Sequence, residues 1–349
     1  MSVAGREFPF TLSDIYVKDW ESQYAVSPTK GSFLLGIGLT NRCNYRCPFC
    51  YYHGEGVEEK ARDLSLEILE KVFQSCSRLS GVNFALEGEP LCYPHFMEAV
   101  ELAAKYADRL MLCTNGSLLT EKLILKLAYF NFSLITLSIN GGDEKSYACF
   151  NQGGSLKRFM RHASAATKTF GRAVVFHTVL FKENLETVKL LPYLAKEAGI
   201  KTLSLACLRE HPAATHRGIT RAAQPDLLKC VEEICDLAQI FGLSVFFDGS
   251  LNLPKIRTWL SERGITPPDQ DRPACTLPWY YTSLLSSGKL FPCCGDFEPS
   301  ATELSFDGIF NHQYLRMLRG HMLNGNVPEA CRSCNHESVC ICREGQSLS

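Results

Sequence analysis

The sequence lacks an excess of charge of either sign. Its 349 residues include 36 Lys and Arg against 37 Asp and Glu, which gives a formal net charge of −1 at pH 7. A protein held by the phosphate backbone of nucleic acid, or by an anionic membrane surface, needs a clear excess of positive charge. We therefore expect neither nucleic acid nor a membrane among its partners.

The sequence also lacks an export signal and a long apolar run. The first ten residues, MSVAGREFPF, contain no apolar h-region, and the longest apolar stretch near them is only Phe33–Leu39. A membrane-spanning helix needs about 18 or more apolar residues. We therefore expect a cytoplasmic protein. The length allows two or three domains with a sizeable core.

Cysteine, in contrast, is abundant. The chain has 17 cysteines among 349 residues, about 5%, which exceeds ordinary usage but stays below that of disulfide scaffolds. Chains stabilised by many disulfides are usually short and secreted. These cysteines are therefore expected to be metal ligands, catalytic thiols or core residues in a reducing compartment.

Short apolar runs alternate with segments of helical period between Phe33 and Asp248. One such segment, 66–73, repeats apolar residues at helical spacing and follows Ser65, a residue type that caps helices. Repeated strand–helix–strand units predict a parallel sheet with right-handed crossovers, and six or seven of them favour a partial (β/α)6 TIM-like barrel. The predicted strands are Phe33–Leu39, Val82–Leu86, Leu110–Cys113, Leu134–Ile139, Ala173–Phe181, Thr202–Cys207 and Leu243–Phe247.

Four parts of the chain are expected from these patterns. Residues 1–32 are too few for a domain and are expected to cover one mouth of the barrel, whose core is 33–248. Residues 249–274 contain several prolines and are interpreted as a linker. Residues 275–349 hold seven of the 17 cysteines, so this small C-terminal domain is expected to need a metal centre instead of an apolar core.

Three cysteines, Cys43-x3-Cys47-x2-Cys50, directly follow the first predicted strand. Ligands of α/β sheets bind at the carboxyl ends of the strands, where this loop must lie. Three thiolates around a [4Fe–4S] cluster would leave one iron with an open position, where chemistry can occur.

This motif, with Phe49 before its last cysteine, resembles the signature of the radical S-adenosylmethionine (radical SAM) superfamily. Further motifs at later strand ends agree with it in order and spacing, over about residues 33–248. They are Gly88-Glu89-Pro90 after the second strand, Thr114-Asn115-Gly116 after the third, Ser138-Ile-Asn140 at the end of the fourth, and Asn184 after the fifth.

The resemblance implies a cofactor set and a reaction. Cys43, Cys47 and Cys50 would bind a [4Fe–4S] cluster that takes an electron from a donor such as flavodoxin or ferredoxin and cleaves SAM to a 5′-deoxyadenosyl radical. That radical abstracts hydrogen from unactivated C–H bonds. Glu89 suits the SAM amino group because a carboxylate pairs with an ammonium. The implied cofactor-binding residues are Phe49, Gly88, Glu89, Pro90, Asn115, Ser138 and Asn140.

The second cysteine group is Cys275, Cys293, Cys331-x2-Cys334, Cys340 and Cys342. Its spacing alone fits zinc and iron–sulfur equally. The surrounding segments resemble the SPASM domain, which follows radical SAM cores and binds auxiliary [4Fe–4S] clusters. The resemblance implies one auxiliary cluster, bound by Cys275, Cys293, Cys331 and Cys334.

This group departs from a full SPASM domain after Cys340. Glu344 stands where a further cysteine is expected, so the domain is more similar to the abbreviated twitch type. Cys294 is adjacent to Cys293 and is an alternative ligand. Whether Cys294, Cys340 and Cys342 bind a second auxiliary cluster stays open.

Two further residues are candidates for the chemistry. Cys207 ends the sixth predicted strand and could return a hydrogen atom to a substrate radical, although a strand cysteine is more often a small core residue. Asp296, beside Cys293 and Cys294, could accept a proton when a substrate radical is oxidised. The alternative is that Asp296 is an acidic residue of a turn without a catalytic role.

The resemblance implies oxidation, epimerisation or cross-linking of a sugar, a cyclitol or a ribosomally made peptide. The 42 residues before Cys43 are few for a fused peptide-recognition domain, which slightly favours a small molecule. The alternative is a non-catalytic binding protein with zinc in both cysteine groups. A protein that only binds zinc would have no use for the Gly88-Glu89-Pro90 motif, which argues against this alternative.

Overall fold

The computed structural model describes most of the barrel core and parts of the C-terminal segment. The described residues are 33–50, 52, 60–76, 79–208, 212–247, 254–262, 277–291, 308 and 310–324. Their strands form one nine-stranded sheet in the order β7-β6-β5-β4-β3-β2-β1-β8-β9. Neighbouring strands from β7 to β8 run parallel, and β9 is antiparallel to β8.

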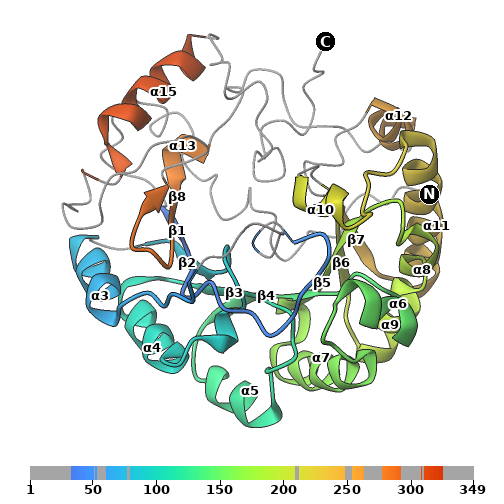
Figure 1. Ribbon diagram of the computed structural model, residues 1–349, viewed down its shortest axis with the longest axis horizontal. Coiled ribbons are helices and arrows are strands. Elements are labelled where there is room, and N and C mark those ends of the chain that lie inside the picture. The colour runs from blue at the N-terminus through green and yellow to red at the C-terminus, as the bar shows by residue number, and fades with distance from the viewer. Residues whose placement is uncertain are drawn as a thin grey trace.

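The strands curve into an arc with helices along its outer side (Figure 1). Among the described residues, β7 and β9 are the two edge strands of the sheet, so the barrel is open. The predicted partial TIM-like barrel is therefore confirmed. The strands are β1 (Leu34–Ile37), β2 (Gly81–Phe84), β3 (Leu110–Thr114), β4 (Phe132–Ser138), β5 (Val174–Leu180), β6 (Thr202–Cys207), β7 (Ser244–Phe247), β8 (Tyr281–Leu284) and β9 (Leu290–Phe291).

Several of the helices begin at a capping residue or at a proline. Ser65 accepts a hydrogen bond from the Glu67 backbone N–H at 3.2 Å and caps the first of them, as its sequence predicts. The helices are α3 (Leu66–Ser75), α4 (Phe96–Tyr106), α5 (Glu121–Leu127), α6 (Glu144–Phe150), α7 (Leu156–Phe170), α8 (Leu185–Val188), α9 (Leu191–Ala198), α10 (Pro212–His216), α11 (Gln224–Phe241), α12 (Pro254–Glu262), α13 (Leu277–Tyr280) and α15 (Gln313–Leu323).

Alternate residues of the strands pack beneath the helices and form the main core. In β1 and its flanks these residues are Phe33, Leu35, Ile37 and Leu39, all at most 3% exposed. Because successive side chains of a strand point to opposite faces, Gly36 and Gly38 lie on the inner side of the barrel. This alternation makes the two glycines part of the inner wall.

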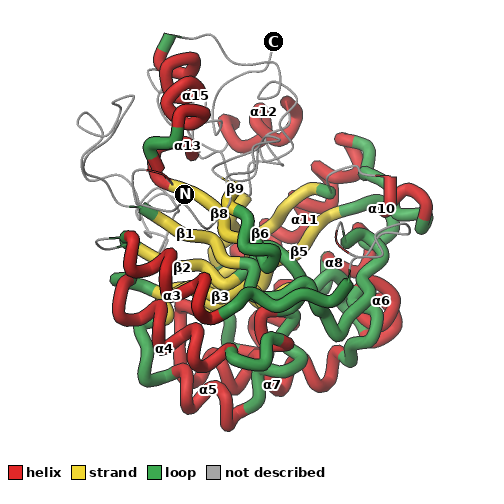
Figure 2. Tube along the Cα trace, turned by 60° about the vertical axis from the view of Figure 1, so that its left-hand side comes forward, coloured by secondary structure: helices red, strands yellow, loops and turns green. Residues whose placement is uncertain are grey.

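Strand β8 comes from the segment that the sequence assigns to the C-terminal domain. It pairs with β1 from Leu34↔Tyr281 to Ile37↔Leu284 and so extends the barrel sheet. Figure 2 shows β8 beside β1, with α13 and α15 following on the same side. Arg319 of α15 is fully buried and donates to the Pro278 carbonyl of α13 at 2.9 Å, which holds these two helices together.

Several expectations for the ends of the chain lie outside the described residues. They include the placement of residues 1–32 over a mouth of the barrel and most of 275–349. Within the predicted linker 249–274, residues Pro254–Glu262 form helix α12. No helix among the described residues is long and apolar enough to cross a membrane.

Candidate active site

The three cysteines of the first motif lie in the loop that begins where β1 ends, and their thiols are close enough to affect one another electrostatically. Burial raises the pKa of Cys43 to about 12, and it also raises the pKa of Cys47, with Cys50 and Cys43 as further causes. Cysteine binds metals as the thiolate. A thiolate is therefore costly in this loop unless a cation compensates it, as iron would.

The donor set of this loop suits an iron–sulfur cluster. Iron–sulfur clusters are held by cysteine thiolates, and a [4Fe–4S] cluster bound by three of them would keep one iron with an open position.

Gly88 packs directly against the start of the cysteine loop. Its φ is +55°, and a Cβ there would collide with the backbone carbonyl oxygens of Thr40 and Arg42. The next residue, Glu89, donates its backbone N–H to the Arg42 carbonyl at 2.7 Å. Glycine is thus required at 88 by its conformation and by the close approach of two backbone segments. This contact fixes the glycine–glutamate motif to the cysteine loop.

Glu89 is a buried carboxylate with three hydrogen-bond donors. Its Oε1 accepts from the Leu91 N–H at 3.1 Å and from the Thr114 hydroxyl at 2.6 Å, and its Oε2 accepts from the Asn115 N–H at 2.7 Å. Burial raises the pKa of Glu89, and the three hydrogen bonds partly offset this effect. No cationic side chain in the described part of the chain pairs with it. Since a carboxylate offers about four acceptor sites, room for one more donor remains.

The Asn115 side chain connects the third strand end to the cysteine loop. Its Nδ2 donates to Asn44 Oδ1 at 2.9 Å and contacts Cys43 Sγ at 3.9 Å, and its Oδ1 accepts from the Ser117 hydroxyl at 2.6 Å. Asn44 Nδ2 in turn donates to Ser117 Oγ at 2.7 Å. These three side chains form a closed ring that holds an amide N–H against a cysteine sulfur.

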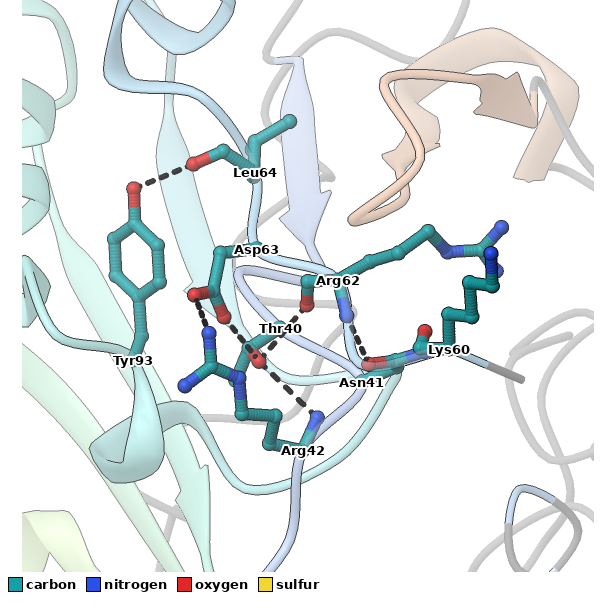
Figure 3. A network of polar contacts seen from close by, with 8 residues as sticks. All are labelled: Thr40, Asn41, Arg42, Lys60, Arg62, Asp63, Leu64 and Tyr93. Carbon is teal, nitrogen blue, oxygen red and sulfur yellow. Dashed lines mark hydrogen bonds and ion pairs between the residues drawn. The ribbon is translucent and has the colours of Figure 1, made fainter. Parts of the chain in front are cut away.

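A second polar network fixes the other side of the loop start (Figure 3). Thr40 donates its hydroxyl to Asp63 Oδ1 at 2.7 Å, and Asp63 also forms an ion pair with Arg42. The Tyr93 hydroxyl donates to the Leu64 carbonyl at 2.5 Å, one residue further along. The segment after the loop is therefore anchored to the start of the loop and to the turn after Glu89.

The comparisons with known proteins agree with this geometry. The model of the radical SAM superfamily matches residues 37–191. A PqqA peptide cyclase of Ruegeria pomeroyi is 26% identical over 319 residues, covering 86% of this chain and 79% of the relative. Residues 37–191 of this chain therefore match the radical SAM superfamily. The chain is accordingly a radical SAM iron–sulfur enzyme.

Solved structures show the same fold. Streptococcus suis SuiB bound to S-adenosylmethionine aligns with a TM-score of 0.66 at 17% identity, covering 90% of this chain and 73% of SuiB. The structure described as native anSMEcpe with bound AdoMet aligns with a TM-score of 0.63 at 18% identity, covering 91% of this chain and 92% of that one. At these identities the likeness concerns the fold.

In the radical SAM barrel described here, the fourth and fifth strand ends are joined by asparagines. Asn140 Oδ1 accepts from the Val179 N–H at 2.9 Å. Asn184 is fully buried, accepts from the Phe181 N–H at 2.9 Å, and donates to the carbonyls of Val179 at 2.8 Å and Asn140 at 3.2 Å. The Asn140 side-chain oxygen and all three of these Asn184 bonds therefore involve backbone groups.

The remaining cofactor-binding candidates are distributed around the same mouth. Phe49 packs against Phe181 with ring centroids 5.3 Å apart, which attaches the cysteine loop to the end of β5. Pro90 is buried and begins the short 3₁₀ helix Pro90–Cys92, for which Glu89 is the N-cap. Ser138 ends β4, and its hydroxyl lies 4.0 Å from Cys113 Sγ.

Neither of the two catalytic candidates is found at this site among the described residues. Cys207 is 3% exposed and belongs to the main apolar core together with Leu203 and Leu205, the residues of β6 with the same alternation. This position does not support the hydrogen-donor prediction. Asp296 lies outside the described residues, as do the auxiliary-cluster candidates Cys275, Cys293, Cys294, Cys331, Cys334, Cys340 and Cys342.

Three residues of the mouth were missed by sequence reasoning. Asn44 lies inside the cysteine motif, and this location is the one sequence feature that could have pointed to it. Cys92 has no informative spacing, yet its Sγ lies 3.8 Å from Asn44 Oδ1 and interacts electrostatically with Cys43. Glu87 precedes Gly88-Glu89 and is buried, with no periodicity or motif to single it out.

Proposed function

We propose that this radical SAM enzyme uses a [4Fe–4S] cluster on Cys43, Cys47 and Cys50 to cleave SAM and abstract hydrogen from a peptide substrate. The observation that carries the proposal is the joint placement of three interacting thiols, the buried Glu89 carboxylate and the Asn115 amide at adjacent strand ends. Each of these groups has a clear task once cluster and SAM are bound.

Glu89 would receive the amino group of SAM. Thr114 and Asn115 hold the carboxylate in place from β3, and the packing of Gly88 fixes its distance from the cysteine loop. A buried carboxylate without a cationic partner is costly, and an ammonium would remove that cost through a charge-assisted hydrogen bond. When bound, the cluster and SAM supply the electron and the 5′-deoxyadenosyl radical.

The barrel residues position and shield the reacting groups. Asn115 places an N–H beside Cys43 Sγ, and hydrogen bonds to ligand sulfurs tune iron–sulfur clusters. Phe49 packs the loop against Phe181 at the end of β5 and reduces the access of water. Ser138 and Asn140 stand at the fourth strand end, where we assign contacts with the remainder of SAM.

A peptide substrate is supported by two of the similarities. The relative that covers 86% of this chain is named a PqqA peptide cyclase. SuiB, which shares the fold, has also been solved bound to its precursor peptide SuiA. These similarities outweigh the slight preference for a small molecule that the short region before Cys43 suggested.

The C-terminal cysteines would add an electron acceptor. We assign one auxiliary [4Fe–4S] cluster to Cys275, Cys293, Cys331 and Cys334, and proton removal beside it to Asp296. An electron outlet favours net oxidation of the substrate, such as cross-linking.

Anaerobic purification and reconstitution test this function. Two cubane clusters predict about eight iron and eight sulfide per chain, and SAM with a reductant should give 5′-deoxyadenosine. The triple variant Cys43→Ala, Cys47→Ala, Cys50→Ala should keep about four iron and lose all SAM cleavage. Zinc in place of iron, with no cleavage, would reject the proposal, and about twelve iron would add a second auxiliary cluster.

The substrate class needs a separate measurement. Candidate precursor peptides encoded near this gene should give a mass loss of about two hydrogens per turnover, as oxidative cross-linking requires. Conversion of a sugar or cyclitol without any peptide product would refute the peptide assignment.

A further inference from the structure

Glu87 is a second buried carboxylate of the barrel mouth, two residues before Glu89. It is 4% exposed and follows Leu86, whose φ of +77° places a non-glycine residue in the left-handed region. Such a conformation is uncommon for leucine and persists only where the surrounding structure enforces it. The backbone before Glu87 is thus held in an unfavourable conformation that gives this side chain its direction.

The Glu87 carboxylate lies against the inner wall of the barrel. A Cβ on Gly38 would be 2.8 Å from Glu87 Oε2 and 3.3 Å from its Cγ. Gly38 directly follows β1 and continues its alternation, so it faces the inside of the barrel, because Ile37 and Leu39 pack beneath the helices. The absent side chain at 38 therefore creates the space in which the carboxylate rests.

The neighbouring wall is polar and comes from β8. The Tyr281 ring covers Gly36, the other inward glycine of β1, and the Ser283 hydroxyl donates to the Tyr281 hydroxyl oxygen at 3.1 Å. Ser286, in the turn after β8, donates its backbone N–H to Glu87 Oε2 at 2.6 Å. Glu87 thus stands where the barrel meets the C-terminal segment.

Two polar groups at this point are incompletely satisfied. Among the described residues, the Ser286 N–H is the one hydrogen-bond donor to the Glu87 carboxylate, and no cationic side chain pairs with it. The Ser286 hydroxyl is itself buried and has no hydrogen-bond partner in the described part of the chain. Glu89, by comparison, has three donors.

We propose that Glu87 and the Ser286 hydroxyl bind a protonated amino group of the substrate. An ammonium has three donors and no acceptor, which matches a carboxylate with free acceptor sites beside a hydroxyl without a partner. A buried polar group left unpaired is costly, and the bound amine would remove that cost at both residues. The ligand class is a primary amine such as a lysine side chain or a peptide amino terminus.

The amine is assigned to the substrate because SAM has a single aliphatic amino group that carries a proton near neutral pH, and Glu89 is already placed for it. The proposal rests on the proposed function only in that a substrate enters this mouth. Its test uses stability and binding of the anaerobically reconstituted protein, so it is read independently of SAM cleavage. If the protein does not cleave SAM but still prefers an amine probe through Glu87, the proposed function is rejected and the amine site is retained.

The first measurement compares Glu87→Gln with Glu87→Ala. Glutamine keeps an oxygen for the Ser286 N–H and removes the charge, so Glu87→Gln should raise the unfolding midpoint by about 2–4 °C. Glu87→Ala should lower it, because the Ser286 N–H loses its acceptor. Glu121→Gln, an exposed glutamate of α5, is the matched control and should leave the midpoint unchanged. If Glu87→Gln lowers the midpoint as much as Glu87→Ala, Glu87 is only an anchor of the turn and the proposal fails.

The second measurement compares the affinities of two probes, Nα-acetyl-lysine amide, whose side-chain amine is free, and Nα-acetyl-norleucine amide, which has no side-chain amine. The wild type should bind the lysine probe at least about tenfold more tightly than the norleucine probe, and Glu87→Gln should remove this difference. No preference in the wild type, or a preference kept in Glu87→Gln, would overturn the proposal.

A third measurement separates the two sources of an amine. S-adenosylhomocysteine carries the amino acid part of SAM, and 5′-methylthioadenosine lacks it. Glu87→Gln should bind both as the wild type does, while Glu89→Gln should lose affinity for S-adenosylhomocysteine alone. If Glu87→Gln selectively weakens S-adenosylhomocysteine, Glu87 serves SAM and the assignment to the substrate is overturned.

Discussion

Two sides of the same barrel mouth use similar polar residues in different ways. On the cysteine side, at the ends of β1–β3, the side chains of Asn44 and Asn115 bond to each other and to the Ser117 hydroxyl, and Asn115 contacts Cys43. On the asparagine side, at the ends of β4 and β5, Asn140 and Asn184 bond to backbone groups. Bonds to the backbone fix the strands, whereas bonds between side chains hold groups toward a ligand.

The difference separates residues that build the mouth from residues that serve its chemistry. Asn184 uses its oxygen and its nitrogen on the chain itself, so its removal should damage the fold. Glu89 keeps an acceptor site and a buried charge that only a ligand can compensate, so its removal should damage binding. Variants on the two sides should therefore differ in kind as well as in size.

The largest effect is expected for Glu89→Gln. The amide has nearly the same shape but lacks the charge, so SAM affinity should fall at least about tenfold and SAM cleavage about 100-fold, with little loss of stability. Equilibrium dialysis and 5′-deoxyadenosine formation measure the two effects. Glu98→Gln, at an exposed glutamate of α4, is the control. Normal SAM affinity in Glu89→Gln would place Glu89 with the structural residues.

Asn184→Ala should show the opposite pattern. It leaves a buried N–H and two buried carbonyls without partners, and the free energy of unfolding should fall by about 3 kcal/mol. Denaturant titration measures this loss, and the spectrum of the reconstituted SAM-binding cluster should stay that of the wild type. Asn131→Ala, which removes one exposed bond to the Asp108 carbonyl, should cost well under half as much. A stable Asn184→Ala that fails to bind SAM would break the comparison.

Asn115→Ala should change the cluster more than the fold. Loss of the N–H beside Cys43 Sγ removes stabilisation of the more negative reduced cluster, so its midpoint potential should fall. Loss of iron to a chelator should accelerate about tenfold. A potentiometric titration followed by electron paramagnetic resonance measures the first effect. Ser117→Ala removes one hydroxyl of the ring but leaves the Asn115 amide and its bond to Asn44, so it is the control. Equal shifts in both variants would contradict a direct effect of the amide.

Asp143→Ala should have the smallest effect, and it depends on pH. Asp143 caps α6 by accepting from the Ser146 N–H at 2.9 Å, which lowers the pKa of Asp143. Because the folded pKa lies below the unfolded one, the carboxylate stabilises the fold above its unfolded pKa and loses this contribution as the pH falls through the folded value. The variant should lose about 1 kcal/mol at pH 7 and less near pH 3.

The control for this prediction is Ser155→Ala, at the cap of α7. Its hydroxyl does not titrate, so its cost should be the same at both values of pH. Unfolding midpoints measured at pH 7 and pH 3 test this, and a pH-independent cost of Asp143→Ala would contradict the role of the charge.

The sequence predicted the seven core strands because each is a short apolar run, and it placed each within a few residues. It did not predict β8, since Tyr281–Leu284 includes Thr282 and Ser283 and forms no apolar run. The cysteine motif and Gly88-Glu89 were recognisable from local spacing. The bond from Asn115 to Asn44 spans 71 residues and the one from Glu87 to Ser286 spans 199, so only the folded chain brings these pairs together.

The pairing of β8 with β1 has a consequence for the order of events during synthesis. β1 leads directly into the cysteine loop, and its edge opposite β2 is covered by residues 281–284. While the ribosome makes the intervening 240 or so residues, that edge has no partner and is open to pairing with other chains. The strand that leads into the cysteine loop is therefore completed late. Iron insertion before that point would act on an unfinished site, which makes late loading of the cluster the safer order for the cell.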